Sequence, residues 1–285
     1  MKLLIFGQTG QVASELARLE PNARFLSRAD ADLTNPAACA QIINTSDADA
    51  IINAAAYTAV DKAETETDLA FQVNGAAPTE MAKAAAAKGI PFIHISTDYV
   101  FNGQGTKPWT PDDPLKPLGI YGQSKLAGET GVRAAGGAHV ILRTSWVVSA
   151  HGSNFVKTML RLAQSLDTLR VVSDQIGGPT PAAAIAKAVV EIAAQLVTKQ
   201  NLTGTYHFAG APDVSWADFA RAIFAEAGQS VTVEDIPAKD YPTPAKRPQN
   251  SRLDCTSLER AFGIKRPDWR AGLQQILADI KEQIS

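Results

Sequence analysis

The sequence predicts an α/β protein built on a Rossmann-type, doubly wound parallel sheet, with a smaller, mixed α/β domain towards the C-terminus. Short apolar runs alternate with helical patterns up to about residue 150. This alternation is typical of a parallel sheet covered by helices. A glycine-rich turn directly follows the first apolar run, and beyond Trp146 the alternation becomes less regular. Together these features predict one large sheet followed by a different, smaller unit.

The composition is that of an ordinary globular protein. Of the 285 residues 45% are hydrophobic and 20% charged, and 27 basic against 29 acidic residues leave a formal charge of −2. With neither a basic balance nor a run of lysines and arginines, nucleic acid and anionic membranes are not expected as partners. Cys39 and Cys255 stand apart, and the apolar N-terminal stretch is too short for a signal peptide. We expect a cytoplasmic protein without a membrane segment.

The N-terminal segment has the form of a nucleotide-binding turn. Residues 2–6 form an apolar strand pattern, Gly7-Gln-Thr-Gly10-Gln-Val-Ala13 follows, and a helical pattern covers residues 14–19. In this context the glycines let a dinucleotide pyrophosphate approach the N-terminus of the helix, and alanine is accepted at the third position. An ordinary turn between a strand and a helix is the alternative.

The end of the second expected strand, residues 23–27, bears on the choice of cofactor. An acidic residue there selects NAD by holding the ribose 2′-hydroxyl, whereas an arginine accommodates the 2′-phosphate of NADP. Arg28 follows the strand, which favours NADPH, although a solvated surface arginine is the alternative. Asp30 and Asp32 come closely enough after it to keep NADH possible. Asp32 and Leu33 are candidates for contacts to the adenine.

The next elements continue the alternation. We expect helices over residues 35–46 and 64–88, and strands over residues 49–55, 90–95 and 138–143. Ligands gather at the carboxyl ends of the strands in such sheets. Polar residues stand at these ends, namely Tyr57, Thr58, Asp61, Lys62, Ser96, Thr97, Asp98 and Tyr99.

A tyrosine and a lysine follow the fourth expected strand. Tyr121 and Lys125 are four residues apart at the start of a helical pattern, so their side chains share one helix face. A phenol is a poor acid at neutral pH, and we expect the Lys125 ammonium to lower the pKa of Tyr121 towards a useful range. Thr97 could hydrogen-bond the same reacting oxygen. Taken alone the pair is a weak signal, because this spacing also occurs by chance on exposed helices.

The C-terminal half is less regular. We expect helices over residues 154–164, 181–197 and 216–227, and strands over residues 169–173, 205–209 and 231–236. The proline-rich, basic segment 240–252 is a linker or part of a binding site; we favour the site, because arginines on a stiffened loop suit phosphate recognition. We expect a dinucleotide-binding domain over residues 1–150, joined by segments near 169–174 and 182–210, and a mainly substrate-binding domain over residues 151–285.

Six blocks in order resemble the dTDP-4-dehydrorhamnose reductase family, within the extended short-chain dehydrogenase/reductase superfamily. They cover essentially the whole chain and are GQTGQV (7–12), NAAAYTAVDKAE (53–64), STDYVF (96–101), YGQSK (121–125), RTSW (143–146) and RPQNSR (247–252). Six blocks in the family's order form a far more specific signal than any one of them.

The resemblance implies a role for each candidate residue. Tyr121 would donate a proton to the sugar C4 oxygen, Lys125 would hold the nicotinamide ribose and tune Tyr121, and Thr97 would complete a triad. The residues implied at the pyrophosphate are Gly7, Gly10, Gln11 and Val12. Those implied along the adenosine and ribose are Asp32, Leu33, Ala54, Ala55, Ala56 and Thr58. Those implied at the nucleotide sugar are Asp98, Tyr99, Trp146 and Arg247. Alternatively, Trp146 is an aromatic residue of the core and Arg247 a solvated charge on a loop.

The implied reaction is the reduction of the C4 ketone of dTDP-4-dehydro-L-rhamnose by NADPH or NADH, in the synthesis of cell-surface polysaccharides such as lipopolysaccharide. One alternative is another nucleotide-sugar reductase, epimerase or dehydratase. Another is a non-catalytic, NADP-binding regulatory subunit like that of methionine adenosyltransferase. Some family members associate through acidic helix positions and a divalent metal, but residues 182–184 are all alanine. We therefore expect no metal site and a monomer or weak homodimer.

Overall fold

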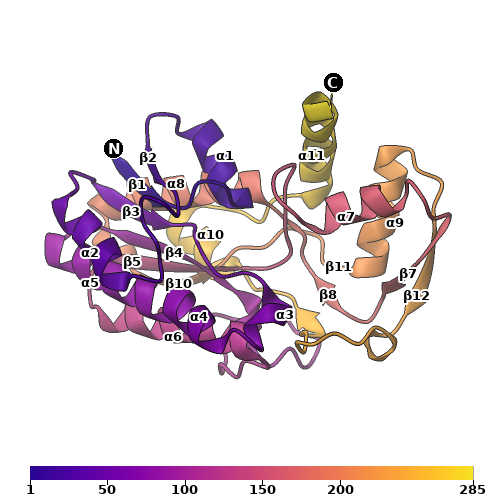
Figure 1. The fold of residues 1–285 in the computed structure, drawn as a ribbon, viewed down its shortest axis with the longest axis horizontal. Coiled ribbons are helices and arrows are strands. Elements are labelled where there is room, and N and C mark those ends of the chain that lie inside the picture. The colour runs from indigo at the N-terminus through magenta and orange to yellow at the C-terminus, as the bar shows by residue number, and fades with distance from the viewer. Residues whose placement is uncertain (285) are drawn as a thin grey trace.

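The computed structural model describes residues 1–284. Its centre is a six-stranded sheet in the order β10-β5-β4-β3-β1-β2 (Figure 1). The strands are β1 (Leu3–Phe6), β2 (Arg24–Leu26), β3 (Ala50–Asn53), β4 (Phe92–Thr97), β5 (His139–Thr144) and β10 (Gly204–His207). All the paired strands of this sheet are parallel, which confirms the predicted fold class. The strand order reverses between β1 and β3, where open α/β sheets bind ligands.

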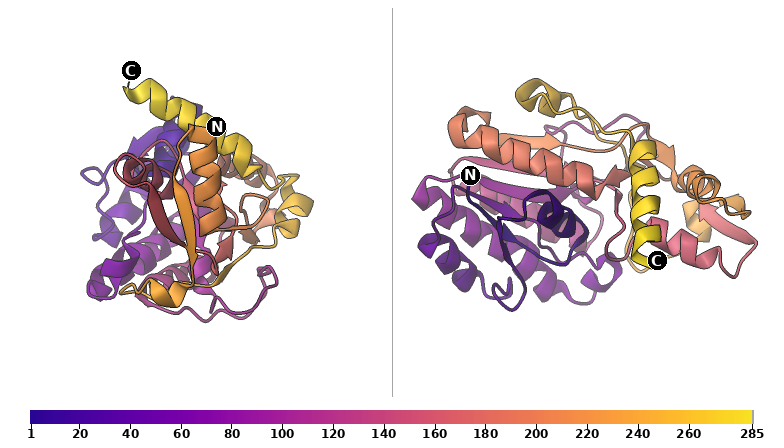
Figure 2. Two further views of the ribbon diagram at one scale, coloured as in Figure 1. Left: turned by 90° about the vertical axis from the view of Figure 1, so that its right-hand side faces the viewer. Right: turned by 90° about the horizontal axis from the view of Figure 1, so that it is seen from above.

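Helices cover both faces of this sheet, as the right-hand view of Figure 2 shows for α8 on one side. One face carries α1 (Gln11–Leu19), α8 (Ala182–Thr198) and α10 (Thr256–Phe262), and the other carries α2 (Pro36–Thr45), α5 (Ala77–Lys88) and α6 (Ile120–Ala134). Along β1, Leu3 and Ile5 join the first core, whereas Leu4 and Phe6 join the second. Alternate side chains of a strand point to opposite faces, so a continuous apolar run suits a strand that is buried on both sides.

The predicted helix over residues 64–88 is wrong at its start. The short helix α3 (Val60–Ala63) comes first, and α4 (Thr67–Phe71), the π-helical turn η1 (Gln72–Ala76) and α5 then follow without a break. Glu64 ends α3, and its carboxylate accepts a hydrogen bond from the backbone N–H of Ile120, 2.9 Å away, at the start of α6. This residue therefore fixes a neighbouring helix instead of extending its own.

The smaller lobe lies to the right of the sheet in Figure 1. It contains α7 (Phe155–Leu162), β7 (Thr168–Val172), α9 (Trp216–Ala227), β12 (Thr232–Ile236) and α11 (Trp269–Ile284), packed around a core that includes Phe219 and Trp269. The expected return of residues 169–174 to the main sheet is wrong, because β7 pairs with β12 in a separate two-stranded sheet. Buried and exposed residues alternate along most of β7, as in a strand that packs on one face only. Residues 182–210 do return, as α8 and β10.

Short elements complete the chain. They are η2 (Asp98–Val100), β6 (Val147–Val148), β8 (Ile176–Gly177), β9 (Thr180–Pro181), η3 (Gln200–Leu202), β11 (Val214–Ser215), η4 (Ala238–Asp240) and β13 (Asn250–Ser251). The proline-rich segment is irregular, as predicted, but its end forms β13, which pairs with β8. The helices α10 and α11 lie beyond the last element expected from the sequence. Within residues 1–284, no helix has the length and apolar character needed to cross a membrane.

Candidate functional site

A cleft of about 1180 Å³ opens at the carboxyl end of the main sheet. The ends of β1, β3, β4 and β5 and the start of α6 contribute to its lining. Every predicted site residue except Arg247 lines it. These residues are Gly7, Gly10, Gln11, Val12, Arg28, Asp32, Leu33, Ala54, Ala55, Ala56, Thr58, Thr97, Asp98, Tyr99, Tyr121, Lys125 and Trp146. The fold thus gathers residues that are far apart in the sequence into one cavity.

The glycine-rich turn leaves the N-terminus of α1 open to this cleft. Gly7 has a φ of +110°, and a Cβ there would lie 3.3 Å from the backbone of Ala54. Gly10 precedes α1 without any side-chain cap, and a Cβ there would meet nothing within 4 Å. The first N–H groups of a helix attract phosphate when no side chain satisfies them. The turn therefore fits a dinucleotide pyrophosphate.

At the far side of the cleft, Arg28 is exposed, and the two nearby carboxylates accept hydrogen bonds from neighbouring residues. Asp30 accepts hydrogen bonds from the backbone N–H and the hydroxyl of Ser27 at 2.9 and 2.6 Å. Asp32 accepts one from the backbone N–H of Thr34 at 2.9 Å. The Arg28 side chain is 81% exposed, with its Nε 4.0 Å from Asp32, so this ion pair restrains it little. Its guanidinium is free to meet an anion.

Lys125 and Tyr121 are both held at the cleft, but their titration differs from expectation. The Lys125 Nζ donates to the carbonyl oxygen of Ile95 at 2.8 Å, and burial lowers the pKa of Lys125 to about 8. Burial also raises the pKa of Tyr121 to about 12, and the hydrogen bond with Thr97 offsets this only in part. The expectation of a lowered Tyr121 pKa is therefore wrong for the free protein, because desolvation of the phenolate is the larger effect.

Two residues that the sequence did not single out as site residues, Asn74 and Gly122, position the start of α6. The Asn74 side chain donates to the carbonyl oxygen of Tyr57 and to the Ser124 hydroxyl, both at 3.0 Å, and accepts from the N–H of Tyr57 at 2.9 Å. Any Cβ on Gly122 would collide with the Tyr99 carbonyl oxygen, so α6 packs directly on η2. In the sequence, Asn74 stands inside an apolar helical pattern, where asparagine is unusual. This was the feature from which its positioning role could have been predicted.

Asp98 is a carboxyl group inside the protein. Its residue is only 2% exposed, and it accepts a hydrogen bond from the Thr97 hydroxyl at 3.1 Å. Burial raises the pKa of Asp98 to about 6, although hydrogen bonds from Ser251 and Thr97 favour the charged form. Such a group titrates close to the working range of an enzyme, which is common at functional sites.

Trp146 closes the cleft on the side of the smaller lobe. Its ring stacks on the ring of Trp216, with ring centroids 3.5 Å apart and planes 12° apart. The ring centroids of Trp216 and Phe155 are in turn 4.5 Å apart. Trp146 has a φ of +49°, which is strained for a bulky residue. Gly177 makes room for it, since a Cβ there would lie 2.8 Å from the indole ring. Trp146 thus lines the cleft and also packs on aromatic residues of the smaller lobe, which the sequence did not indicate.

Arg247 does not line the cleft. Its guanidinium pairs with the carboxylate of Asp61 at 2.8 Å and 3.3 Å, and this contact lowers the pKa of Asp61. Asp61 also accepts from the backbone N–H of Ala245 at 3.1 Å. The proline-rich segment is therefore attached to α3 of the larger lobe, next to the cleft-lining Tyr99. Burial raises the pKa of Tyr99, and the charge of Arg247 opposes this rise.

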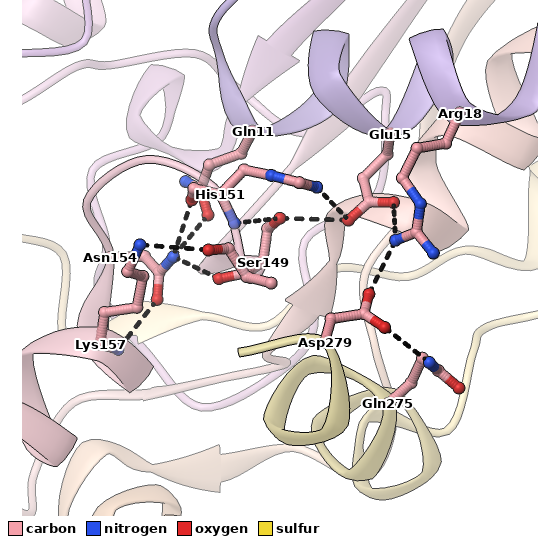
Figure 3. Close-up of polar contacts among 10 residues, drawn as sticks. Gln11, Glu15, Arg18, Ser149, His151, Asn154, Lys157, Gln275 and Asp279 are labelled. Carbon is pink, nitrogen blue, oxygen red and sulfur yellow. Dashed lines mark hydrogen bonds and ion pairs between the residues drawn. The ribbon is translucent and has the colours of Figure 1, made fainter. Parts of the chain in front are cut away.

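A polar network links the nucleotide side of the cleft to the smaller lobe (Figure 3). Asn154 caps α7 by accepting from the N–H of Lys157, and its Nδ2 donates to the Gln11 side chain at 3.0 Å. The same Nδ2 donates to the carbonyl oxygens of Ser149 and His151 at 2.7 and 3.3 Å. One amide thus ties the first residue of α1 to the loop that leads into α7.

The second part of this network lies one turn further along α1 (Figure 3). The buried Glu15 accepts from the Ser149 hydroxyl at 3.2 Å and from Arg18 at 3.3 Å. Arg18 also pairs with Asp279 of α11 at 2.7 Å. The helix that begins at the glycine-rich turn is therefore fixed to both the loop and the C-terminal helix.

The chain matches the family model described as RmlD substrate binding domain over residues 1–282. It is 45% identical to the dTDP-4-dehydrorhamnose reductase of Sinorhizobium fredii, over 97% of each chain. The chain belongs to the dTDP-4-dehydrorhamnose reductase family. This finding confirms the resemblance that the six sequence blocks carry.

Two solved structures of the dTDP-4-dehydrorhamnose reductase family share the fold closely. The protein of Clostridium acetobutylicum superposes with a TM-score of 0.91 at 36% identity, covering 99% of this chain and 100% of the other. That of Bacillus anthracis, solved in complex with NADP, gives a TM-score of 0.90 at 34% identity, covering 98% and 100%. Family membership leaves the roles of individual residues as predictions.

Proposed function

We propose that this protein reduces the C4 ketone of dTDP-4-dehydro-L-rhamnose to dTDP-L-rhamnose, with NADPH as the hydride donor and NADH as a possible substitute. The observation that carries the proposal is one cleft that joins a phosphate-binding turn to Thr97, Tyr121 and Lys125. Membership of a family of reductases with this name supports the same reaction.

The nucleotide side of the cleft supports NADPH. The open N-terminus of α1 suits the pyrophosphate, and the exposed Arg28 suits a 2′-phosphate. A relative at 34% identity was solved with NADP. When bound, the cofactor supplies the hydride, and the protein contributes binding, orientation and a proton.

Tyr121 is the proton donor in this proposal. With a pKa of about 12 the phenol is fully protonated at neutral pH, as a donor must be. Thr97 hydrogen-bonds Tyr121 and would orient the phenol towards the ketone oxygen. Lys125 lies on the same helix face, and its charged form would stabilise the phenolate that remains once the proton has left. Burial of these three groups would strengthen their electrostatic interactions.

The sugar nucleotide would lie between η2 and the aromatic residues of the smaller lobe. Asp98 and Tyr99 face it from η2, and Trp146 faces it from the end of β5. Arg247 would contribute by holding the proline-rich segment beside the cleft, or by exchanging Asp61 for a phosphate of the substrate. The free, buried Cys39 and Cys255 support a reducing compartment, the cytoplasm. We expect a monomer or weak homodimer, which sedimentation would test.

The decisive test is direct turnover. The purified protein is mixed with dTDP-4-dehydro-L-rhamnose and NADPH or NADH, and loss of reduced-nicotinamide absorbance is followed together with the mass of the nucleotide sugar. We expect the sugar to gain two hydrogens for each NADPH consumed. A UDP-linked 4-keto sugar serves as the comparison substrate. Tight NADPH binding without reduction of either sugar would contradict the proposal and favour a non-catalytic binding subunit.

A further inference from the structure

Thr144 is the last residue of β5, and its hydroxyl has no partner within the protein. The residue is only 4% exposed, although it lines the cleft. Within residues 1–284, no hydrogen-bond partner reaches its buried Oγ1. A buried hydroxyl without a partner is costly, and such groups are rare in folded proteins. The function proposed above gives this hydroxyl no task.

The direction of the Thr144 side chain follows from the alternation along β5. Val140 and Leu142 belong to the core under α1 and α8, whereas Ile141 belongs to the core on the other face of the sheet. Alternate side chains of a strand share a face, so Thr144 points to the face that α1 covers. Thr97 stands directly opposite Thr144 in the register of β4 and β5. The two hydroxyl-bearing residues therefore lie side by side at the carboxyl end of the sheet.

The chain that follows Thr144 leads to the glycine-rich turn. Residues 145–147 all line the cleft. The carbonyl oxygen of Val147 accepts a hydrogen bond from the Gln11 side chain, with 3.4 Å between the two atoms, and Gln11 is the first residue of α1. Thr144 thus lies between the turn that fits the pyrophosphate and Thr97 at the proposed site of reduction.

The order of the strands decides which half of a dinucleotide would meet Thr144. Arg28, which suits the 2′-phosphate of the adenosine half, follows β2 at one edge of the sheet, and β1, β3, β4 and β5 come next in that order. An adenosine at β2 and a pyrophosphate at the turn after β1 direct the nicotinamide half towards β4 and β5. The polar substituent of a nicotinamide ring is a carboxamide, which both donates and accepts hydrogen bonds, as a threonine hydroxyl does.

We propose that the Thr144 hydroxyl binds the carboxamide of the nicotinamide ring of NADPH. The inference rests on NADPH as the hydride donor of the proposed function. The carboxamide lies off the axis of the bond that joins the ring to its ribose. A hydrogen bond to it would therefore fix the rotation of the ring about this bond, and with it the choice of ring face that is turned towards the sugar.

The nucleotide sugar is the competing partner for this hydroxyl. The direction of the side chain favours the cofactor, because Thr144 points to the side of α1, the helix that begins at the phosphate-binding turn. Asp98 and Tyr99, which are expected at the sugar, belong to η2, and η2 packs against α6 on the opposite side of the sheet. Binding measurements without the sugar separate the two ligands.

The test compares NADPH with ADP-ribose 2′-phosphate, which keeps both riboses and all the phosphates but lacks the nicotinamide. Both are titrated by calorimetry into the full-length protein without the sugar. Thr144→Val preserves the shape of the side chain and removes its hydroxyl. We expect the Kd for NADPH to rise about 2–10-fold, as for the loss of one hydrogen bond, and the Kd for ADP-ribose 2′-phosphate to stay unchanged. An unchanged Kd for NADPH, or an equal rise for both ligands, would overturn the inference.

The stability of the ligand-free protein gives a second readout. Because the Thr144 hydroxyl has no partner there, Thr144→Val should leave the midpoint of urea denaturation unchanged or raise it. A lower midpoint would show that the hydroxyl is paired within the protein, which would overturn the inference.

The matched control is Ser257→Ala. It removes another buried hydroxyl without a partner, on α10 and away from the residues that line the cleft, and should leave both Kd values unchanged. Neither readout uses ketone reduction. The protein can therefore fail to reduce the sugar while Thr144 binds the carboxamide, and it can reduce the sugar while Thr144 has no part in binding NADPH.

Discussion

Replacing Asp98 by asparagine should make the protein more stable, because the buried carboxylate is costly. Burial moves the pKa of Asp98 from its usual 3.8 to about 6. Below about pH 4 the carboxyl is protonated in both the folded and the unfolded states. Between about pH 4 and 6 only the folded state keeps the proton, so stability falls as the pH rises through this window. Above pH 6 the full penalty applies.

The size of the gain follows from the shift. About two pKa units at 1.36 kcal/mol each give about 3 kcal/mol, so Asp98→Asn should gain up to about this amount near pH 7 and almost nothing near pH 4. Urea denaturation of both proteins at the two pH values measures it. Asp254→Asn is the control of opposite sign, because contacts with Thr256 lower the pKa of Asp254. An equal effect of Asp98→Asn at both pH values, or a loss near pH 7, would refute the reasoning. If Asp98 faces the substrate, kcat/KM should fall as stability rises.

Four further substitutions test the two sides of the cleft. Arg28→Ala should weaken NADPH by about 1.5–3 kcal/mol and spare NADH, since only NADPH has the 2′-phosphate; equal losses for the two cofactors, measured by calorimetry, would make Arg28 structural. Trp146→Ala and Arg247→Ala should raise KM for the sugar more than they lower kcat and leave NADPH affinity intact. A loss of NADPH affinity with an unchanged KM for the sugar would place both residues on the cofactor side of the cleft instead. Asn154→Asp keeps an acceptor for the α7 cap but removes the donor to Gln11, so the Kd for NADPH should rise with the fold intact, and an unchanged Kd would show that this link is not needed for binding.

The sequence predicted those features that depend on neighbouring residues. The strands of the main sheet, the turn from Gly7 to Gly10 and the shared helix face of Tyr121 and Lys125 all follow from local patterns. The helix expected over residues 154–164 is α7, whose N-cap is Asn154, and α9 was predicted with the bounds that the structure gives it.

Features that depend on distant partners were not predictable from one chain. The sequence pattern of a strand does not show which strand it pairs with, so β7 was assigned to the wrong sheet. Arg247 and Asp61 are 186 residues apart in the sequence, and no periodicity brings them together. The stacking of Trp146 on Trp216 has the same cause. The predicted direction of the Tyr121 pKa shift was wrong, because the spacing to Lys125 is visible in the sequence, whereas burial is a property of the fold.

The most direct test of the proposed catalysis is the rate of ketone reduction by Tyr121→Phe. The ring and its edge-on contact with Tyr99 remain in this variant, and only the proton donor is lost. General acid catalysis by a placed side chain contributes about 10²–10⁴-fold, so kcat should fall by that factor while NADPH still binds and the protein stays folded. A variant that reduces dTDP-4-dehydro-L-rhamnose as fast as the parent protein would contradict the assignment of Tyr121 as the acid.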